Sequence, residues 1–227
     1  MPIYRTPEKI TERTEDYKTY YADKVSWSAR DGVAEKEIAE RVSLDAHVLD
    51  IGTGGGAFLA SLKKKGYRNL YGADLENYLS YIATDDLRGF SQTNINTEKL
   101  TFPDGSMDAV TALAFLEHVE NGFHLARECA RVLKPGGYLF VTLPYIYNLS
   151  SRFRFLFGGH LDGYTSHNDH IMVLPREVFA KCFYGHFTLE KELPGNAFIR
   201  IPLFGIKLRF VPPRFFGNKV LFVLKKK

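Results

Sequence analysis

Val48-Leu49-Asp50-Ile51-Gly52-Thr53-Gly54-Gly55-Gly56-Ala57-Phe58-Leu59 is the stretch that decides the fold of this 227-residue chain. Its apolar beginning predicts a buried strand, and residues 57–65 predict a helix with Phe58, Leu59 and Leu62 facing inward. The glycines between them let the backbone adopt positive φ and let a ligand approach atoms that a Cβ would block. Unpaired N–H groups at the helix start favour an anionic group there. The stretch therefore predicts a nucleotide-like ligand at the carboxyl end of the first strand of an open α/β sheet.

Two ligand classes fit this turn, and Asp50 helps to separate them. Gly52-x-Gly54-x-x-Ala57 satisfies the dinucleotide pattern, and Asp74 follows at a suitable distance for a ribose contact. A pyrophosphate would lie close to the Asp50 carboxylate and be repelled. S-adenosylmethionine has no phosphate, and a carboxylate attracts its ammonium and sulfonium. A glycine turn without a ligand would lose backbone entropy for no evident gain. The methyl donor is favoured.

Three motifs carry a resemblance to a known family. Residues 48–56 resemble the first motif of the class I S-adenosylmethionine-dependent methyltransferases. Residues 116–119 (LEHV) and 131–137 (RVLKPGG) resemble later motifs of the ubiquinone-biosynthesis type, in the same order and at family spacing. The resemblance covers about residues 45–145. It implies a doubly wound, Rossmann-like α/β fold with a seven-stranded, mostly parallel sheet whose last strand is antiparallel between its neighbours.

The same resemblance implies a cofactor pocket for S-adenosylmethionine. Asp74 ends a predicted strand at residues 69–74; it would accept hydrogen bonds from the ribose hydroxyls, with a helix N-cap as the alternative. Leu75 would lie on the adenine. Asn94 corresponds to a residue near adenine N6, where Asp is commoner in the family. The expected cofactor-binding residues are Asp50, Gly52, Thr53, Gly54, Gly56, Asp74, Leu75, Asn94, Ile95 and Leu113.

Further elements are predicted from periodicity and turn residues. Asn121 would cap a helix whose Phe123, Ala126, Ala130 and Leu133 share one face. Cys129 and Cys182 fall in predicted helices, as buried small hydrophobes rather than metal ligands. The other predicted helices are at 77–87 and 175–183, and the other predicted strands at 89–95, 107–113, 138–143, 188–193 and 219–224.

Composition predicts one globular domain over residues 1–227. Within it, residues 1–45 are expected to form a helical leader, 46–145 the cofactor-binding core, and 146–227 the substrate-side loops and closing strands. In the resembling family such a leader covers the cofactor as a lid; its aromatic residues would equally suit contact with the sheet. The net charge of +4 does not call for nucleic acid as a partner. Neither a signal peptide nor a membrane-spanning run is recognised, so the cytoplasm is expected.

The acceptor should lie over the strand ends, in the loops after the fourth and fifth strands. Methyl transfer needs in-line alignment, and a hydroxyl acceptor also needs a base. The candidate catalytic residues are His118, which the family motif contains, and His167 and His170, for which a polar surface loop is the alternative. A metal site at these histidines is disfavoured, since Ala114 stands near the place where the metal-dependent catechol type has an acid.

The predicted function is methyl transfer to a small-molecule or metabolite acceptor, with oxygen favoured. The segment Leu113-Ala114-Phe115-Leu116 lacks the Asn/Asp-Pro-Pro-Tyr/Phe pattern of amine methyltransferases that act on bases or glutamine. The alternatives are an NAD-dependent oxidoreductase and a non-catalytic S-adenosylmethionine-binding protein.

Basic and aromatic residues alternate at 151–157 and again at 199–216, and Lys225, Lys226 and Lys227 follow. This pattern suits peripheral contact with an anionic membrane surface. The alternative is a half-buried strand or loop with its cations on the wet side, which the usual burial of large apolar residues favours.

Overall fold

A computed structural model describes residues 32–161, 163–164, 169–195, 197, 199–201, 206–208 and 211–227 of the chain. Side chains at 199–201 and 206–208 are not described. Most of the predicted leader, at residues 1–31, and the candidate base His167 lie outside the described residues.

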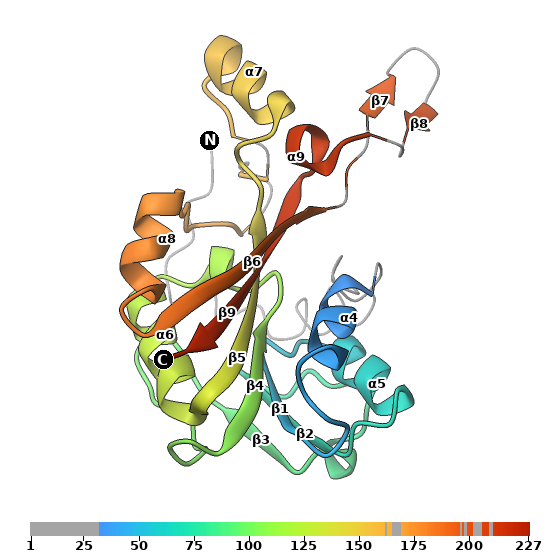
Figure 1. Cartoon of the computed structure of the whole chain (residues 1–227), viewed down its shortest axis with the longest axis vertical. Helices are drawn as coiled ribbons and strands as arrows, with labels where there is room; N and C mark the ends of the chain where they lie inside the picture. Colours follow the sequence, from blue (N-terminus) through green and yellow to red (C-terminus); the bar gives the residue numbers. More distant parts are fainter. Residues whose placement is uncertain are drawn as a thin grey trace.

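One seven-stranded sheet forms the centre of the molecule, in the order β3-β2-β1-β4-β5-β9-β6 (Figure 1). The first five strands pair in parallel, and β9 pairs antiparallel with both β5 and β6. The predicted doubly wound sheet, with its last strand antiparallel between its neighbours, is confirmed. The strands are β1 (His47–Ile51), β2 (Asn69–Asp74), β3 (Gly89–Gln92), β4 (Met107–Ala112), β5 (Leu133–Pro144), β6 (Phe187–Gly195) and β9 (Lys219–Lys226).

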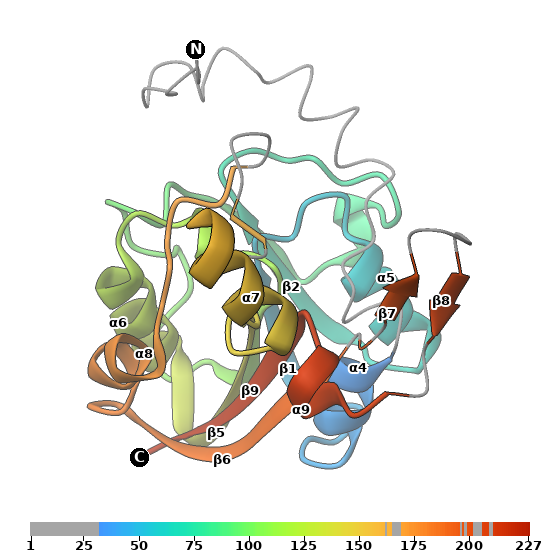
Figure 2. The ribbon, with the colours of Figure 1, turned by 90° about the horizontal axis from the view of Figure 1, so that it is seen from above.

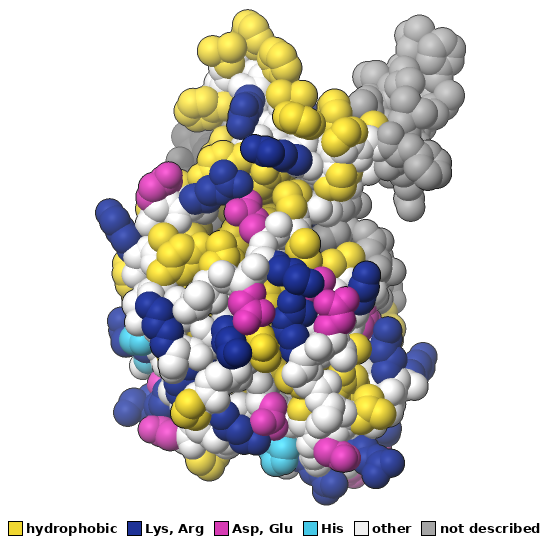
Figure 3. Space-filling model, viewed as in Figure 1, with side chains coloured by type: hydrophobic (Ala, Val, Ile, Leu, Met, Phe, Trp, Pro, Cys, Tyr) yellow, Lys and Arg dark blue, Asp and Glu magenta, His cyan; other side chains and the backbone are white. Residues whose placement is uncertain are grey.

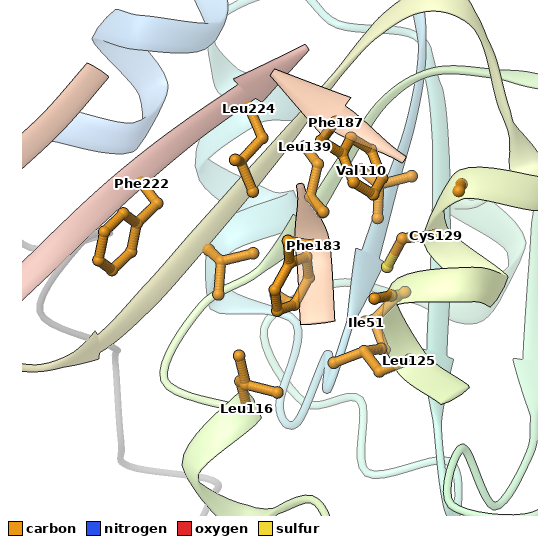
Figure 4. Close-up of a cluster of buried hydrophobic side chains, with 14 of the residues drawn as sticks. Ile51, Val110, Leu116, Leu125, Cys129, Leu139, Phe183, Phe187, Phe222 and Leu224 are labelled. Atoms are coloured by element: carbon orange, nitrogen blue, oxygen red, sulfur yellow. The ribbon is translucent and has the colours of Figure 1, made fainter. Parts of the chain in front are cut away.

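Helices cover both faces of the sheet, which explains why its central strands are apolar throughout. On one face, α4 (Val33–Ala39) and α5 (Ala57–Lys64) bury Ile38, Leu59 and Leu62 against Val48. On the other face lie α6 (Gly122–Val132) and α8 (Arg176–Phe183), as Figures 1 and 2 show. Their buried side chains meet the opposite side of the strands, and Figure 4 shows this cluster around Ile51, Val110, Leu125, Cys129, Leu139, Phe183, Phe187 and Leu224.

The prediction of a helix at residues 77–87 is wrong. That segment is a loop with a single 3-10 turn, η1 (Thr84–Asp86), and its backbone folds onto the glycine turn. The amides of Ser80 and Tyr81 donate to the Gly55 carbonyl at 3.0 and 2.9 Å. A long-range contact with the glycine turn therefore replaces the local helical hydrogen bonds, which sequence periodicity cannot reveal.

Asn121 caps α6 as predicted, because its side chain accepts from the His124 amide at 3.0 Å. The predicted inward face is only partly correct. Ala126 and Ala130 are buried, but Phe123 is 49% exposed and Leu133 belongs to β5. Cys129 and Cys182 are buried free thiols, as predicted.

Residues 151–157 lie within a helix, α7 (Leu149–Gly158), so the alternative of a half-buried strand or loop there is wrong. This helix stands beyond the carboxyl end of β5, beside the short helix α9 (Pro213–Phe216) (Figure 1). A two-stranded hairpin of β7 (Ile199–Ile201) and β8 (Ile206–Leu208) extends at the same end. Among the described helices, none is both long and apolar enough to cross a membrane.

Candidate functional site

In the glycine turn after β1, neighbouring side chains approach the backbone so closely at two positions that only glycine fits. Gly52 has φ 73°, and a Cβ added there would lie 2.1 Å from Cδ2 of Phe115. Gly56 has φ 81°, and its added Cβ would lie 2.5 Å from Cγ2 of Ile82. Positive φ and close neighbours both exclude a side chain at these positions. The loop after β4 and the loop after β2 therefore both close on the glycine turn.

Asp74 ends β2 and is hydrogen-bonded to the same turn. Its carboxylate accepts from the amides of Gly54 at 2.8 Å and Leu75 at 2.7 Å. Burial raises its pKa to about 6, with the two amide hydrogen bonds opposing that rise and Glu76 adding to it. The helix N-cap alternative for Asp74 is wrong, because no helix begins at this residue.

Asp50, in β1, is a buried carboxylate that faces the neighbouring strand. Thr111 of β4 donates its hydroxyl to Oδ1 of Asp50 at 2.5 Å. Burial raises the pKa of Asp50 to about 8, and the nearby Asp74 adds to the rise while the Thr111 hydrogen bond opposes it. Thr53 locks the strands together by donating to the Asp50 carbonyl and accepting from the Ala73 amide. A buried carboxylate of this kind favours a cationic ligand, whose charge would stabilise the ionised form.

The remaining predicted cofactor residues divide between core and surface. Ile95 and Leu113 are buried within the two apolar clusters, on opposite faces of the sheet. Leu75 and Asn94 are half-buried. The Asn94 side chain accepts from the Asn96 amide at 3.1 Å, so it stabilises its own turn.

A second group of polar side chains gathers beyond the ends of β4 and β5. Glu117, in the 3-10 turn η2 (Leu116–His118), has no exposed surface, and neither carboxylate oxygen accepts a hydrogen bond from the described residues. One of these oxygens lies 3.7 Å from Nζ of Lys219 and 4.0 Å from Nε2 of His170. The rings of His118 and His170 meet edge to face at a centroid distance of 4.8 Å. The structure thus brings together two of the three predicted catalytic histidines.

Backbone hydrogen bonds position this histidine pair. Nδ1 of His118 lies 3.0 Å from the Asp169 carbonyl. The amides of Ile171 and Met172 donate to the Glu117 carbonyl at 2.9 and 3.1 Å, and so anchor the segment after His170. Burial lowers the pKa of His170, and the Glu117 carboxylate partly opposes this change. His170 therefore stays neutral near neutral pH and retains a lone pair.

Glu117, His118 and His170 each offer a metal-ligating atom, and these atoms lie within 4.8 Å of one another. Lys219 already places an ammonium beside the Glu117 carboxylate and would repel a metal cation. The expected absence of a metal stays a prediction.

Sequence reasoning missed Lys219 as a member of this group. Lys219 begins a strand that the sequence indicates only as a closing strand, and it is the antiparallel pairing of β9 with β5 that brings the ammonium to Glu117. The close approach of Phe115 to Gly52 was also not predicted, although Gly52 lies in the first recognised motif and Phe115 directly precedes the second.

Comparison with known proteins agrees with this geometry. Residues 49–141 match the family model of a methyltransferase domain. The chain contains a class I S-adenosylmethionine-dependent methyltransferase domain. Its cofactor is S-adenosylmethionine, as predicted.

The relatives support the domain assignment over a limited part of the chain. The ubiquinone biosynthesis O-methyltransferase of Coxiella burnetii is 35% identical over 113 residues, which cover 47% of each chain. That of Xanthomonas oryzae pv. oryzae is 38% identical over 104 residues, covering 43% of this chain and 42% of the relative. The chain thus spans less than half the length of the curated relatives that it matches.

Solved structures share the fold at low sequence identity. An S-adenosylmethionine-dependent methyltransferase from Archaeoglobus fulgidus has a TM-score of 0.60 at 18% identity, covering 98% of this chain and 100% of that one. One from Methanosarcina mazei has a TM-score of 0.57 at 20% identity, covering 84% and 96%. This likeness extends over β6 and β9, beyond the residues that match the family model.

Proposed function

We propose that this methyltransferase domain transfers the methyl group of S-adenosylmethionine to a hydroxyl oxygen of a small-molecule acceptor. The observation that carries the proposal is the group beyond the end of β4, in which the half-buried His118 and His170 lie beside the buried Glu117. Phe115 joins this group to the glycine turn. A hydroxyl acceptor held between the two would have a proton acceptor within the same loop. The relatives described above are named as O-methyltransferases, which agrees with an oxygen acceptor.

The residues of the glycine turn fit the proposed cofactor. The buried Asp50 carboxylate suits the cationic ammonium and sulfonium, and the turn leaves no room for a Cβ at Gly52. Asp74 keeps lone pairs beyond its two amide hydrogen bonds and can accept from ribose hydroxyls. When bound, the sulfonium supplies an electrophilic methyl group. The chain's contribution is to align the acceptor with it and to remove a proton.

Either imidazole of the pair can serve as the base. The carbonyl of Asp169 can only accept a hydrogen bond, so a neutral His118 carries its proton on Nδ1 and leaves Nε2 as an acceptor. His170 is kept neutral by burial, so its base form persists below pH 6.5. Once protonated, an imidazolium beside Glu117 would be stabilised by the carboxylate. We assign the base to this pair.

The test compares His118→Ala and His170→Ala with a matched control, His186→Ala. His186 is exposed at the opposite edge of the sheet, before β6. We expect kcat to fall by roughly 10²- to 10⁴-fold in at least one of the pair variants, with unchanged affinity for S-adenosylhomocysteine. Unchanged turnover in both would remove the base from this group. The same assay can include His167→Ala, the remaining candidate.

The acceptor is identified by mass spectrometry of products formed from labelled S-adenosylmethionine and a metabolite extract. Label found on oxygen supports the proposal, whereas label on nitrogen or carbon contradicts it. Tight S-adenosylhomocysteine binding without transfer to any extract fraction would indicate the non-catalytic binding protein. Tight NAD binding without S-adenosylhomocysteine binding would indicate an oxidoreductase.

A further inference from the structure

The helix α7 presents its apolar side chains to solvent. Phe153 is 60% exposed, Leu156 is 73% exposed and Phe157 is 81% exposed. Their spacing of three and four residues places them on one face, together with Leu149. The small polar residue Ser151, by contrast, is completely buried. A surface helix normally turns its apolar face toward the core, but α7 is exposed from Arg152 to Gly158, and Phe155, on another side of the helix, is also 61% exposed.

The base of this helix is firmly held, so its exposure is not that of a frayed end. Asn148 is buried; its side chain accepts from the Ser151 amide at 2.7 Å and donates to the Tyr145 carbonyl at 2.6 Å. Tyr145 in turn donates its amide to the Asn218 carbonyl, next to β9. The rings of Phe153 and Phe157 stack at a centroid distance of 6.5 Å. The exposed face is therefore a fixed feature of the structure.

The charged side chains of α7, of α9 and of the described residues next to them in the chain have one sign. Residues 145–161 and 211–218 contain Arg152, Arg154 and Arg214 but no Asp or Glu. At 3.6 residues per turn, Arg152 and Arg154 lie on the two sides of the apolar stripe. Phe215 of the neighbouring α9 adds a further exposed ring. In Figure 3, hydrophobic side chains gather over α7 and Lys or Arg side chains lie just below them.

We propose that α7, with α9 beside it, docks the protein peripherally on an anionic lipid membrane. Shallow insertion would remove the aromatic side chains from water, while the flanking arginines reach the anionic headgroups. Because both segments carry arginines and no acids, their charge is complementary to an anionic lipid surface. A neutral protein partner would not require this charge. The exposure of these side chains thus favours membrane contact, and not the half-buried strand or loop, for residues 151–157. The related pattern at 199–210 lies outside the described side chains.

Sedimentation with vesicles tests the proposal in the full chain. We expect pelleting with phosphatidylcholine–phosphatidylglycerol vesicles, weaker pelleting with phosphatidylcholine alone, and loss at high salt. Arg152→Gln/Arg214→Gln should weaken the anionic partition coefficient by about fivefold per cation. Its control, Lys65→Gln/Arg68→Gln, removes the same charge from exposed positions at the opposite edge of the sheet and should change it little.

The apolar contribution has its own matched pair. Phe153→Ser/Phe157→Ser should weaken partition by at least roughly tenfold, whereas Leu44→Ser, at an exposed leucine before β1, should not. Unchanged S-adenosylhomocysteine affinity would show that the variants remain folded. Equal pelleting with neutral and anionic vesicles, or none with either, would overturn the proposal. So would a dimer in vesicle-free solution that Phe153→Ser/Phe157→Ser converts to monomer, because the face would then be a contact between two copies.

Discussion

The two halves of the carboxyl edge differ in the hydrogen bonds that their carboxylates accept. In the cofactor half, Asp74 accepts two backbone amides and Asp50 accepts the Thr111 hydroxyl. In the acceptor half, Glu117 accepts no hydrogen bond from the described residues and has only an ammonium and an imidazole at 3.7 and 4.0 Å. The first half is preorganised by its own backbone. The second has unused capacity for hydrogen bonds, which a bound acceptor could fill.

The largest expected effect concerns Asp74. Asp74→Asn removes a charged acceptor and places an amide nitrogen against the N–H of Gly54 or Leu75. We expect the affinity for S-adenosylhomocysteine to fall by about 10²- to 10³-fold in calorimetric titration. Asp85→Asn, at an exposed acid in η1, is the control. An unchanged affinity in Asp74→Asn would mean that Asp74 does not contribute to binding of the ribose.

The glycine turn allows a comparison of two substitutions with the same backbone conformation. Gly52→Ala and Gly105→Ala both force alanine into positive φ, at 73° and 60°. Only at Gly52 does the new Cβ collide with a side chain, that of Phe115. We expect both to lose about 1 kcal/mol of stability from the backbone. Gly52→Ala should in addition weaken S-adenosylhomocysteine binding by roughly tenfold or more, and equal binding in the two variants would contradict the close contact.

The acceptor half can be tested through its ion pair. Lys219→Met leaves the Glu117 carboxylate buried without its ammonium, and we expect about 1–3 kcal/mol of lost stability, since Lys219 retains partial solvent access. This corresponds to a few degrees in the midpoint of thermal unfolding. Glu117→Gln/Lys219→Met should recover most of the loss. If the double variant is no more stable than Lys219→Met, the two groups are not coupled.

The smallest effect is a pH slope set by Asp50. Burial raises its folded pKa from 3.8 to about 8, so between these values the folded state binds a proton that the unfolded state does not. Stability of the ligand-free protein should therefore fall as pH rises toward 8. Asp74 contributes with the same sign only up to about pH 6, and His170 with the opposite sign only below 6.5. Between pH 6.5 and 8 the wild-type protein should lose about 1 kcal/mol of stability per pH unit. Asp50→Asn should flatten this dependence of stability on pH. Thermal unfolding at several pH values measures both slopes. A slope equal to that of wild type would mean that Asp50 is ionised in the free protein.

The sequence predicted the strands and the glycine turn of the cofactor half well because these elements are close together in the chain. Strand β2 was predicted with its observed bounds, and the turn from β1 to α5 follows from glycine spacing. The acceptor half depends on residues about fifty and a hundred positions apart, Glu117, His170 and Lys219, which only the folded sheet brings together. The loop at 77–87 and the helix α7 escaped prediction for related reasons. The first exchanges helical bonds for contacts with Gly55, and the second exposes the apolar face that periodicity would have placed inside.

The insertion of β9 between β5 and β6 has a consequence for synthesis of the protein. All strands that hold the glycine turn and Asp74 have been translated once β4 is complete, so the cofactor half can form early. β5 and β6 have no direct pairing and are joined only through β9. At about 5–20 residues per second, a nascent chain spends several seconds with one edge of β5 unpaired. Lys219 arrives with the last strand, so the acceptor half matures after the cofactor half.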